Sequence, residues 1–258
     1  MSISEKLQVI AENQELVYQV GYDKGYSKGY SAGNKVGVGN LVGDTFTVSC
    51  NYPPKTIKVY ENKDSVGIRD YHLDGYTELE TVYVPMAKYV GECAFRNCTK
   101  LANIGLGCEV LYYEDGNPVE WYGLVTVSGS AFSGCTSLRN CSLHFDVDSN
   151  QRIGSYAFKN CTNLEQIDLK LFAGEIASNA FDGCNNLKTL IIRNEVDTAS
   201  LPSRFYNSSI EQTGYIYIPS KFLSDYQAAC QNYASQFRAL EDYTVDGTLY
   251  GEFDETKI

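Results

Sequence analysis

The sequence has little histidine, tryptophan or methionine: two His, one Trp and two Met occur among 258 residues. With only His72 and His144, and no Cys-x-x-Cys pair among nine cysteines, the sequence contains no zinc-binding pattern. Neither histidine lies in a recognisable catalytic motif with a nucleophile or a paired carboxylate. We therefore predict no catalytic residue, no cofactor site and no metal site, and expect a non-enzymatic protein.

Long apolar runs and an excess of positive charge are also missing. The longest purely aliphatic run, Leu190-Ile191-Ile192, is far too short to span a bilayer, so no membrane insertion is expected. The 21 Lys+Arg and 32 Asp+Glu give a net charge of -11, which disfavours nucleic acid as a partner. Met1 to Val20 contains three glutamates and no unbroken apolar centre, unlike a secretory signal peptide. We expect the chain either to stay inside the cell or to leave it without such a peptide.

What the sequence does contain is a phrase, Ala-Phe-x-x-Cys-x-x-Leu, that occurs four times. Its phenylalanines are 37, 26 and 23 residues apart, a spacing typical of solenoid repeats. They are Phe95, Phe132, Phe158 and Phe181. A β-branched residue stands five positions before each of them, namely Val90, Val127, Ile153 and Ile176. Because a single unit of this size cannot bury its apolar side alone, we expect the repeats to stack.

Each phrase leads into a pair of apolar residues separated by one position, as strands with one buried face require. The pairs are Ile104 and Leu106, Cys141 and Leu143, Ile167 and Leu169, and Leu190 and Ile192. We expect one short strand per repeat, paired in parallel along the stack. Weaker copies precede Pro85 and follow Phe205, the latter ending before Pro219, and since proline is tolerated at sheet margins we expect these two to be terminal caps.

The phrase and its apolar beat resemble the BspA-type leucine-rich repeat, over roughly Leu79 to Ile218. The segment after Pro219, with Tyr226, Tyr233 and Leu240 in a helix-like frame, resembles the helical end cap of such arrays. The resemblance implies a β-dominated α/β fold, a leucine-rich-repeat solenoid with short parallel strands, here preceded by an N-terminal helix. It also implies extracellular binding and no reaction.

Four cysteines occupy the same place in the repeat and should form one inward row: Cys98, Cys135, Cys161 and Cys184. Stacked strands lie about 4.8 Å apart, so distance alone does not exclude disulfides between neighbours. The odd total favours free thiols that fill the core as small apolar groups. Both interpretations stay open at the level of sequence.

The beginning of the chain indicates a self-associating helix. Ser2 and Glu5 form a capping box, and apolar residues then recur at heptad spacing in a pattern that favours three or four strands. Gly-Tyr pairs follow at intervals of four, so tyrosines from other chains would pack into the notches that the glycines leave. The predicted contact residues of this homo-oligomer, with a trimer favoured, are Ile3, Leu7, Ile10, Val17, Tyr22, Tyr26 and Tyr30. The alternative is a flexible Gly-rich tether.

This N-terminal segment, from Ser2 through the Gly-Tyr pairs, also resembles the leading segment of structural proteins from tailed bacteriophages and prophages. That resemblance implies a tail-associated protein that folds in the host cytoplasm, assembles with other virion proteins and binds a bacterial surface or mucosal glycan or protein. The alternative is a bacterial surface adhesin or extracellular host-interaction protein, exported without a signal peptide.

Four segments are predicted. Residues 1–34 form the N-terminal helix, 35–43 a Gly-rich linker, 44–242 the solenoid with its end caps, and 243–258 a C-terminal tail that forms a hairpin. Within the solenoid, residues 45–60 alternate polar and apolar around Pro53-Pro54, which predicts a hairpin over the first repeat.

Two surfaces are candidates for ligand binding. The first is an insertion after Leu106, where Asp115-Gly116 predicts a hairpin bearing Tyr112, Tyr113, Trp121 and Tyr122. The second is the strip of outward residues at the strand centres, Tyr83, Gly105, Ser142, Asp168, Ile191 and Tyr217, of which Tyr83, Asp168 and Tyr217 are the predicted contacts. Alternatively, the aromatic residues only pack on the solenoid edge and the strip is only solvated.

Overall fold

The computed structural model describes residues 40–42, 45–47, 53, 55–62, 65–107, 110–112, 118–121, 123–146, 150–194 and 198–243. The predicted N-terminal helix, with its seven contact residues, and the tail after Tyr243 lie outside these residues. The predicted linker, 35–43, overlaps the first strand, β1 (Asn40–Val42), which pairs antiparallel with β2 (Thr45–Thr47).

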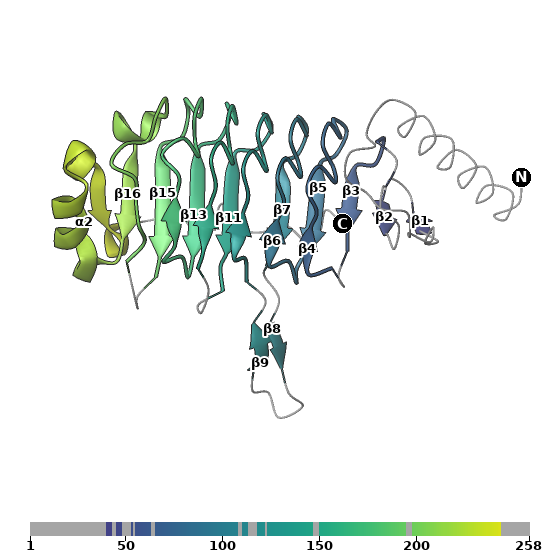
Figure 1. Cartoon of the computed structure of the whole chain (residues 1–258), viewed down its shortest axis with the longest axis horizontal. Helices are drawn as coiled ribbons and strands as arrows, with labels where there is room; N and C mark the ends of the chain where they lie inside the picture. Colours follow the sequence, from purple (N-terminus) through teal and green to yellow (C-terminus); the bar gives the residue numbers. More distant parts are fainter. Residues whose placement is uncertain are drawn as a thin grey trace, which may run out of the picture.

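The described repeats stack into one elongated solenoid (Figure 1), as the spacing of the phrase predicts. One long side carries two sheets in succession. The first has the order β1-β2-β3-β5-β7, with β3 (Val59–Glu61), β5 (Thr81–Val84) and β7 (Asn103–Leu106). The second has the order β11-β13-β15-β16-β17, with β11 (Asn140–His144), β13 (Gln166–Lys170), β15 (Thr189–Arg193), β16 (Tyr215–Ile218) and β17 (Phe237–Ala239). Apart from β1 with β2, every pair within these two sheets is parallel.

Five of the coils supply a second strand, whereas the sequence predicted one strand per repeat. The second set forms a separate parallel sheet of two-residue strands, β4 (Gly67–Ile68), β6 (Tyr89–Val90), β10 (Thr126–Val127), β12 (Arg152–Ile153) and β14 (Glu175–Ile176). The second residue of each is the β-branched residue before the phrase, and it is buried in the core. Two-residue strands leave too short a pattern for their period to be recognised in sequence.

Two predictions about the sheet margins are wrong. Residues Thr45–Thr47 and Val59–Glu61 pair in parallel, so they belong to successive coils and not to a hairpin. The strands that precede Pro85 and Pro219 are both interior, because β5 lies between β3 and β7, and β16 between β15 and β17. Each proline follows the last residue of its strand, so its missing N–H removes no bond from the ladder.

The core is built on a column of aromatic rings, one per repeat. Phe95, Phe132 and Phe158 are fully buried, and their ring centroids are 5.2 and 5.1 Å apart with nearly parallel planes. The column continues through Phe181 to Phe205 with centroids 5.7 and 5.9 Å apart. The prediction that the repeated phenylalanines share one column is therefore confirmed. The column also includes Phe205, from the weaker copy that follows the four clear ones.

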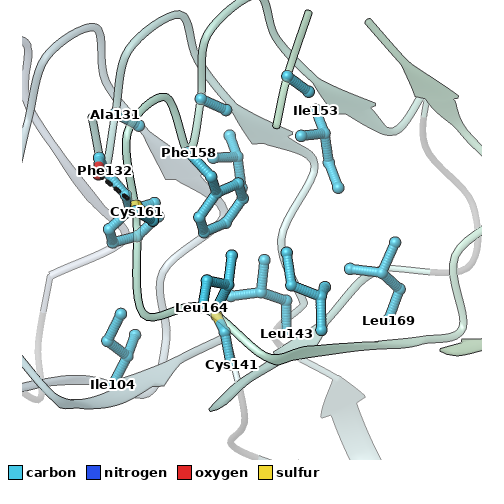
Figure 2. Close-up of a cluster of buried hydrophobic side chains, with 14 of the residues drawn as sticks. Ile104, Ala131, Phe132, Cys141, Leu143, Ile153, Phe158, Cys161, Leu164 and Leu169 are labelled. Atoms are coloured by element: carbon cyan, nitrogen blue, oxygen red, sulfur yellow. Dashed lines mark hydrogen bonds between the residues drawn. The ribbon is translucent and has the colours of Figure 1, made fainter. Parts of the chain in front are cut away.

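The repeated cysteines are free thiols, as are all seven cysteines in the described part of the chain. Each repeated thiol donates a hydrogen bond of 3.0 to 3.1 Å to a backbone carbonyl of the preceding coil. Figure 2 shows one of them, from Cys161 to the carbonyl of Phe132, beside the ring of Phe158. Burial raises the pKa of Cys98 to about 12 and that of Cys135 and Cys161 well above the ordinary value. The row thus fills the core and also ties successive coils together.

The residue before each repeated cysteine follows a rule that the sequence analysis missed. At this place in six successive coils Gly and Asn alternate, always with a positive φ: Gly75, Asn97, Gly134, Asn160, Gly183 and Asn207. In the first and last of these coils the following residue is Tyr76 and Ser208 instead of cysteine. Asn and Gly are the residues that adopt this left-handed conformation most readily. The alternation has a steric reason, since a Cβ on Gly134 would lie 2.6 Å from the Asn97 Oδ1, and one on Gly183 would lie 2.3 Å from the Asn160 Oδ1.

We expect Gly183→Ala to lower the free energy of unfolding by about 2 kcal/mol, because the left-handed backbone is strained with a Cβ and the new methyl overlaps Asn160. Urea unfolding followed by circular dichroism measures the change. Gly129→Ala is the matched control, since its Cβ would meet only the Ser155 carbonyl at 3.4 Å. Asn160→Gly in the same chain should recover part of the loss, and an equal loss in both glycine variants would contradict the steric account.

The C-terminal end of the core is closed by short helices. They are η1 (Ser209–Glu211), η2 (Ser220–Phe222), α2 (Leu223–Ala229), η3 (Gln231–Gln236) and η4 (Leu240–Asp242). Tyr226 and Tyr233 are buried, and Tyr233 ends the aromatic column 5.4 Å from Phe205. The predicted helical frame does not extend to Leu240, because strand β17 intervenes and Leu240 is only half-buried. The tyrosine hydroxyls are satisfied inside this cap: Tyr226 accepts from the N–H of Ala199, and Tyr233 donates to the carbonyl of Pro202.

Candidate ligand-binding surface

The strip predicted from the strand centres exists as a row in register. Ser142 pairs with Asp168, Asp168 with Ile191, and Ile191 with Tyr217 in the second sheet. Tyr83 pairs with Gly105 in the first sheet. We call these residues of β11, β13, β15 and β16, together with Gln166, Lys170 and Arg193 on the same side, the outward face. It is a continuous surface along four coils.

The centre of the outward face is less accessible than the sequence suggested. Ser142, Asp168 and Ile191 keep only 7%, 5% and 0% of their exposure, while Tyr83 and Tyr217 are half-buried. The Ser142 hydroxyl has no hydrogen-bond partner in the described part of the chain. The expectation that the strand-centre positions face solvent is therefore wrong for Ser142, Asp168 and Ile191, and for Gly105, which is buried too. Only the two tyrosines offer ring surface to a ligand.

An ion pair accounts for the burial of Asp168. The Arg193 Nε lies 2.9 Å from both carboxylate oxygens, and Arg193 comes from the next coil. The aspartate side chain is 6% exposed and the arginine 33%. A carboxylate this buried is stable only with a charged, hydrogen-bonded partner. Asp168 therefore joins two coils, which is a structural role that the sequence analysis did not assign.

A residue that sequence reasoning missed accounts for the cover over Ile191. Tyr243, which the analysis had placed in the tail, donates its hydroxyl to the Gln166 Oε1 at 2.7 Å. Its ring centroid lies 4.8 Å from that of Tyr217. Since β15 lies between the strands of these two partners, Tyr243 spans the outward face above Ile191. Burial, with the nearby Asp168 carboxylate, raises the pKa of Tyr243, and 77 residues separate it from Gln166, so no local sequence signal could reveal the contact.

The outward face carries a column of basic groups at one edge. His144, Lys170 and Arg193 end successive strands and are paired in register. All three are half-buried in a chain whose net charge is -11. The Arg193 charge is already balanced by the Asp168 carboxylate, so we assign no ligand to this edge.

The predicted insertion hairpin is present. Strands β8 (Val110–Tyr112) and β9 (Pro118–Trp121) pair antiparallel, with an irregularity between Leu111 and Tyr112. In Figure 1 the hairpin projects away from the stack. Tyr112 and Trp121 are the last residues of their strands, whereas Tyr113 and Tyr122 lie outside the described residues. Ligand contact by these four aromatic residues remains a prediction.

The two histidines of the chain both lie within its described residues. No group of three His, Cys, Asp or Glu residues suited to a metal ion occurs there. His72 is buried, and its Nε2 lies 3.2 Å from the Tyr60 hydroxyl. Burial, with the positive charge of Arg69, lowers the pKa of His72 to about 4. Among the helices that the structure describes, none has the length and apolar character needed to cross a membrane.

His72 predicts a pH dependence of stability. Its folded pKa of about 4 lies below the ordinary value of 6.5, so the unfolded chain binds the proton first as the pH falls. The contribution of His72 is therefore complete above the ordinary pKa and is lost toward pH 4. We expect the loss of this contribution to lower the free energy of unfolding by about 2 kcal/mol between about pH 7 and pH 5. Urea unfolding at both pH values, compared with His72→Gln, measures this share, and equal pH slopes for the two proteins would contradict it.

The repeat pattern and the stacked parallel strands together define a leucine-rich-repeat solenoid. The family of the BspA type leucine rich repeat region matches residues 55–115 and 122–235, in six copies. The chain belongs to this family. None of the curated protein sequences matches it.

Solved structures agree with the fold. The pneumococcal vaccine antigen PcpA matches with a TM-score of 0.55 and 18% identity, over 76% of this chain and 44% of that chain. The T. pallidum leucine-rich repeat protein TpLRR has a TM-score of 0.37 and 25% identity, over 67% of this chain and 86% of that chain. A leucine-rich repeat protein from Bacteroides ovatus has a TM-score of 0.35 and 18% identity, over 74% and 60%. The chain thus spans less than half of PcpA, and this likeness shows the fold alone.

Proposed function

We propose that the protein is a non-enzymatic binding protein of a bacterial surface, where its solenoid recognises a glycan or a protein. The observation that carries this proposal is the set of tyrosines that the coils hold at the surface. Tyr71, Tyr89, Tyr156, Tyr206 and Tyr215 are 38 to 53% exposed. Tyrosine combines a large rigid ring with a polar tip, so a rigid array of exposed rings favours recognition at low entropic cost.

The family match also supports a binding role. The structural neighbours include a leucine rich cell surface protein from Faecalibacterium prausnitzii, with a TM-score of 0.32 and 16% identity. A repeat scaffold builds long surfaces from small units, which suits an extended glycan or peptide. Among these tyrosines we place the contact on Tyr156, Tyr206 and Tyr215, and we add the insertion hairpin with Tyr112 and Trp121.

The other candidate is a virion component, anchored as a homotrimer by the N-terminal helix to other virion proteins. Its support is the sequence of residues 1–34, which lie outside the described residues, and no comparison adds to it. Size-exclusion chromatography with light scattering on the full chain tests the anchor. A trimer mass that Ile10→Asp reduces to a monomer would favour this candidate, and a monomeric wild-type chain would remove the anchor.

Binding of the tagged full chain to intact bacteria and to immobilised mucin tests the surface role. We expect saturable binding to at least one of these surfaces. Trp121→Ala combined with Tyr112→Ala should weaken that binding if the hairpin contributes, and unchanged binding would exclude the hairpin as the contact. Absence of saturable binding to every surface would overturn the proposed function.

A further inference from the structure

A pocket of about 330 Å³ opens on the edge of the solenoid where the repeats turn between their two strands. We call it the turn-edge pocket. Its lining residues are Tyr156, Ser178, Asn179, Asp182, Tyr206 and Asn207. They come from three consecutive coils, so the pocket is a product of stacking and does not exist in any single repeat.

Two tyrosines form its sides. Tyr156 belongs to the coil of β12, and Tyr206 belongs to the second coil after it. The Tyr206 N–H donates a hydrogen bond to the carbonyl of Ser178, in the coil between them. In that coil, Asn179 stands at the position equivalent to Tyr156. The middle coil therefore has a small side chain where the first coil has a tyrosine. The two tyrosines thus line the pocket from coils that are two steps of about 4.8 Å apart along the stack. Their side chains are 38% and 53% exposed, so both offer ring surface to a ligand in the pocket.

The floor of the pocket is polar and fixed. The Asn207 Nδ2 donates to the Asp182 Oδ1 at 2.8 Å, and the Lys159 Nζ lies 3.7 Å from the Asp182 Oδ2. The same Lys159 ammonium lies 4.5 Å from the ring centroid of Tyr156, so one cation holds both a side and the floor in place. Each carboxylate oxygen has acceptor capacity beyond one hydrogen bond, which leaves Asp182 able to accept from ligand hydroxyls.

These features select a class of ligand. Flat aromatic sides suit a ring with apolar C–H faces, and a floor of one carboxylate, two amides and one hydroxyl suits a rim of hydroxyl groups. The charges of Asp182 and Lys159 compensate each other, so the site carries no net charge for an ionic ligand. The volume lies at the small end of the range for ligand pockets, which runs from about 300 to 1,000 Å³.

We propose that the turn-edge pocket binds one neutral hexopyranose unit of a glycan, with its C–H faces on Tyr156 and Tyr206 and its hydroxyls on Asp182, Asn179 and Asn207. The inference rests on the proposed binding function and names its ligand class. It adds a site that the sequence analysis did not assign, because Tyr156 and Tyr206 lie 50 residues apart in the sequence. Glycans that display such a unit in a chain would then be held along the edge of the stack.

Saturation-transfer NMR and calorimetric titration of the full chain with the methyl glycosides of glucose, galactose and mannose test this assignment. We expect at least one of them to bind with a millimolar dissociation constant, as is usual for a single small contact. Tyr156→Ala or Tyr206→Ala should weaken that binding by about tenfold, which corresponds to about 1.4 kcal/mol. Asp182→Asn should weaken it as well, because the amide replaces an acceptor of the ligand's hydroxyls by a donor.

Tyr71→Ala provides the matched control. Tyr71 holds the same place in its repeat as Tyr156, with φ of 57° against 60°, and Arg96 lies over its ring as Lys159 does over that of Tyr156. It is 45% exposed but lines no part of the turn-edge pocket. Its substitution therefore reproduces the loss of an exposed ring at a left-handed backbone position and should leave hexoside binding unchanged.

Three outcomes would overturn the proposal: no saturable binding of any of the three glycosides at tens of millimolar, equal binding by wild type and both pocket tyrosine variants, or equal losses in these variants and in Tyr71→Ala. Circular dichroism melting of each variant shows that the fold is retained. Failure here is distinguishable from failure of the surface role. Wild-type binding to cells or mucin that both pocket variants retain would leave the surface function standing and remove the pocket as its site.

Discussion

Phe132→Ala is expected to lower the free energy of unfolding by about 3–5 kcal/mol, the usual cost of a large aromatic deletion in a closed core. Phe132 has no exposed surface and stacks between Phe95 and Phe158. Because each coil contacts only its neighbours, the cavity would also weaken the coupling between the two halves of the stack. Urea unfolding followed by circular dichroism and tyrosine fluorescence should show a lower midpoint and a less cooperative transition.

Phe132→Leu is the matched control for this experiment. It keeps most of the buried volume and should cost less than about 1.5 kcal/mol. A loss below about 1 kcal/mol for the alanine variant would show that the column is loosely packed, contrary to ring centroids only 5.1 to 5.2 Å apart. Similar losses for the two variants would assign the effect to the aromatic contact itself and not to volume.

Gln151→Ala is expected to cost about 3 kcal/mol, because one buried amide satisfies three backbone groups. The Gln151 Nε2 donates to the carbonyls of Asp146 and Leu171 at 2.5 and 2.9 Å, and its Oε1 accepts from the N–H of Ala173 at 2.6 Å. The side chain is only 4% exposed. Removal of the amide takes this partner from the Asp146 carbonyl and the Ala173 N–H on two adjacent coils, while the Leu171 carbonyl keeps a 3.3 Å hydrogen bond from the Asn194 Nδ2.

Thermal and urea unfolding measure this loss, with Gln212→Ala as the control. Gln212 is an exposed glutamine, and its replacement should change the free energy of unfolding by less than about 0.5 kcal/mol. Gln151→Glu keeps the acceptor but loses the two donors, so it should be destabilising too. A change below about 1 kcal/mol in Gln151→Ala would indicate that water replaces all three bonds without penalty.

The stacking of the coils could be predicted because the side chains that cause it recur with a fixed spacing. Phe95 and its repeats, and the pairs such as Ile167 and Leu169, each carry the same burial in every copy. The left-handed position before each cysteine was equally predictable, since only Asn and Gly occur there. The two-residue strands, such as Arg152–Ile153, were not, because a strand that short has no period of its own.

The candidate surfaces were harder to predict for a physical reason. The outward face was found as a row, but its accessibility depends on contacts between distant segments. Tyr243 reaches Gln166 across 77 residues, and the Arg193 guanidinium covers Asp168 from the neighbouring coil. The turn-edge pocket needs three coils of unequal composition. Periodicity reports what repeats share, whereas binding sites arise where one coil differs from the next.

The row of repeated cysteines allows the unfolding of the solenoid to be followed. Each of the four repeats buries one thiol completely, and burial raises the pKa of Cys135 and Cys161 well above the ordinary value. An alkylating reagent can reach a given sulfur only after its own coil detaches from the one before. Mass spectrometry after timed alkylation would therefore give the order in which the coils of the solenoid detach from one another.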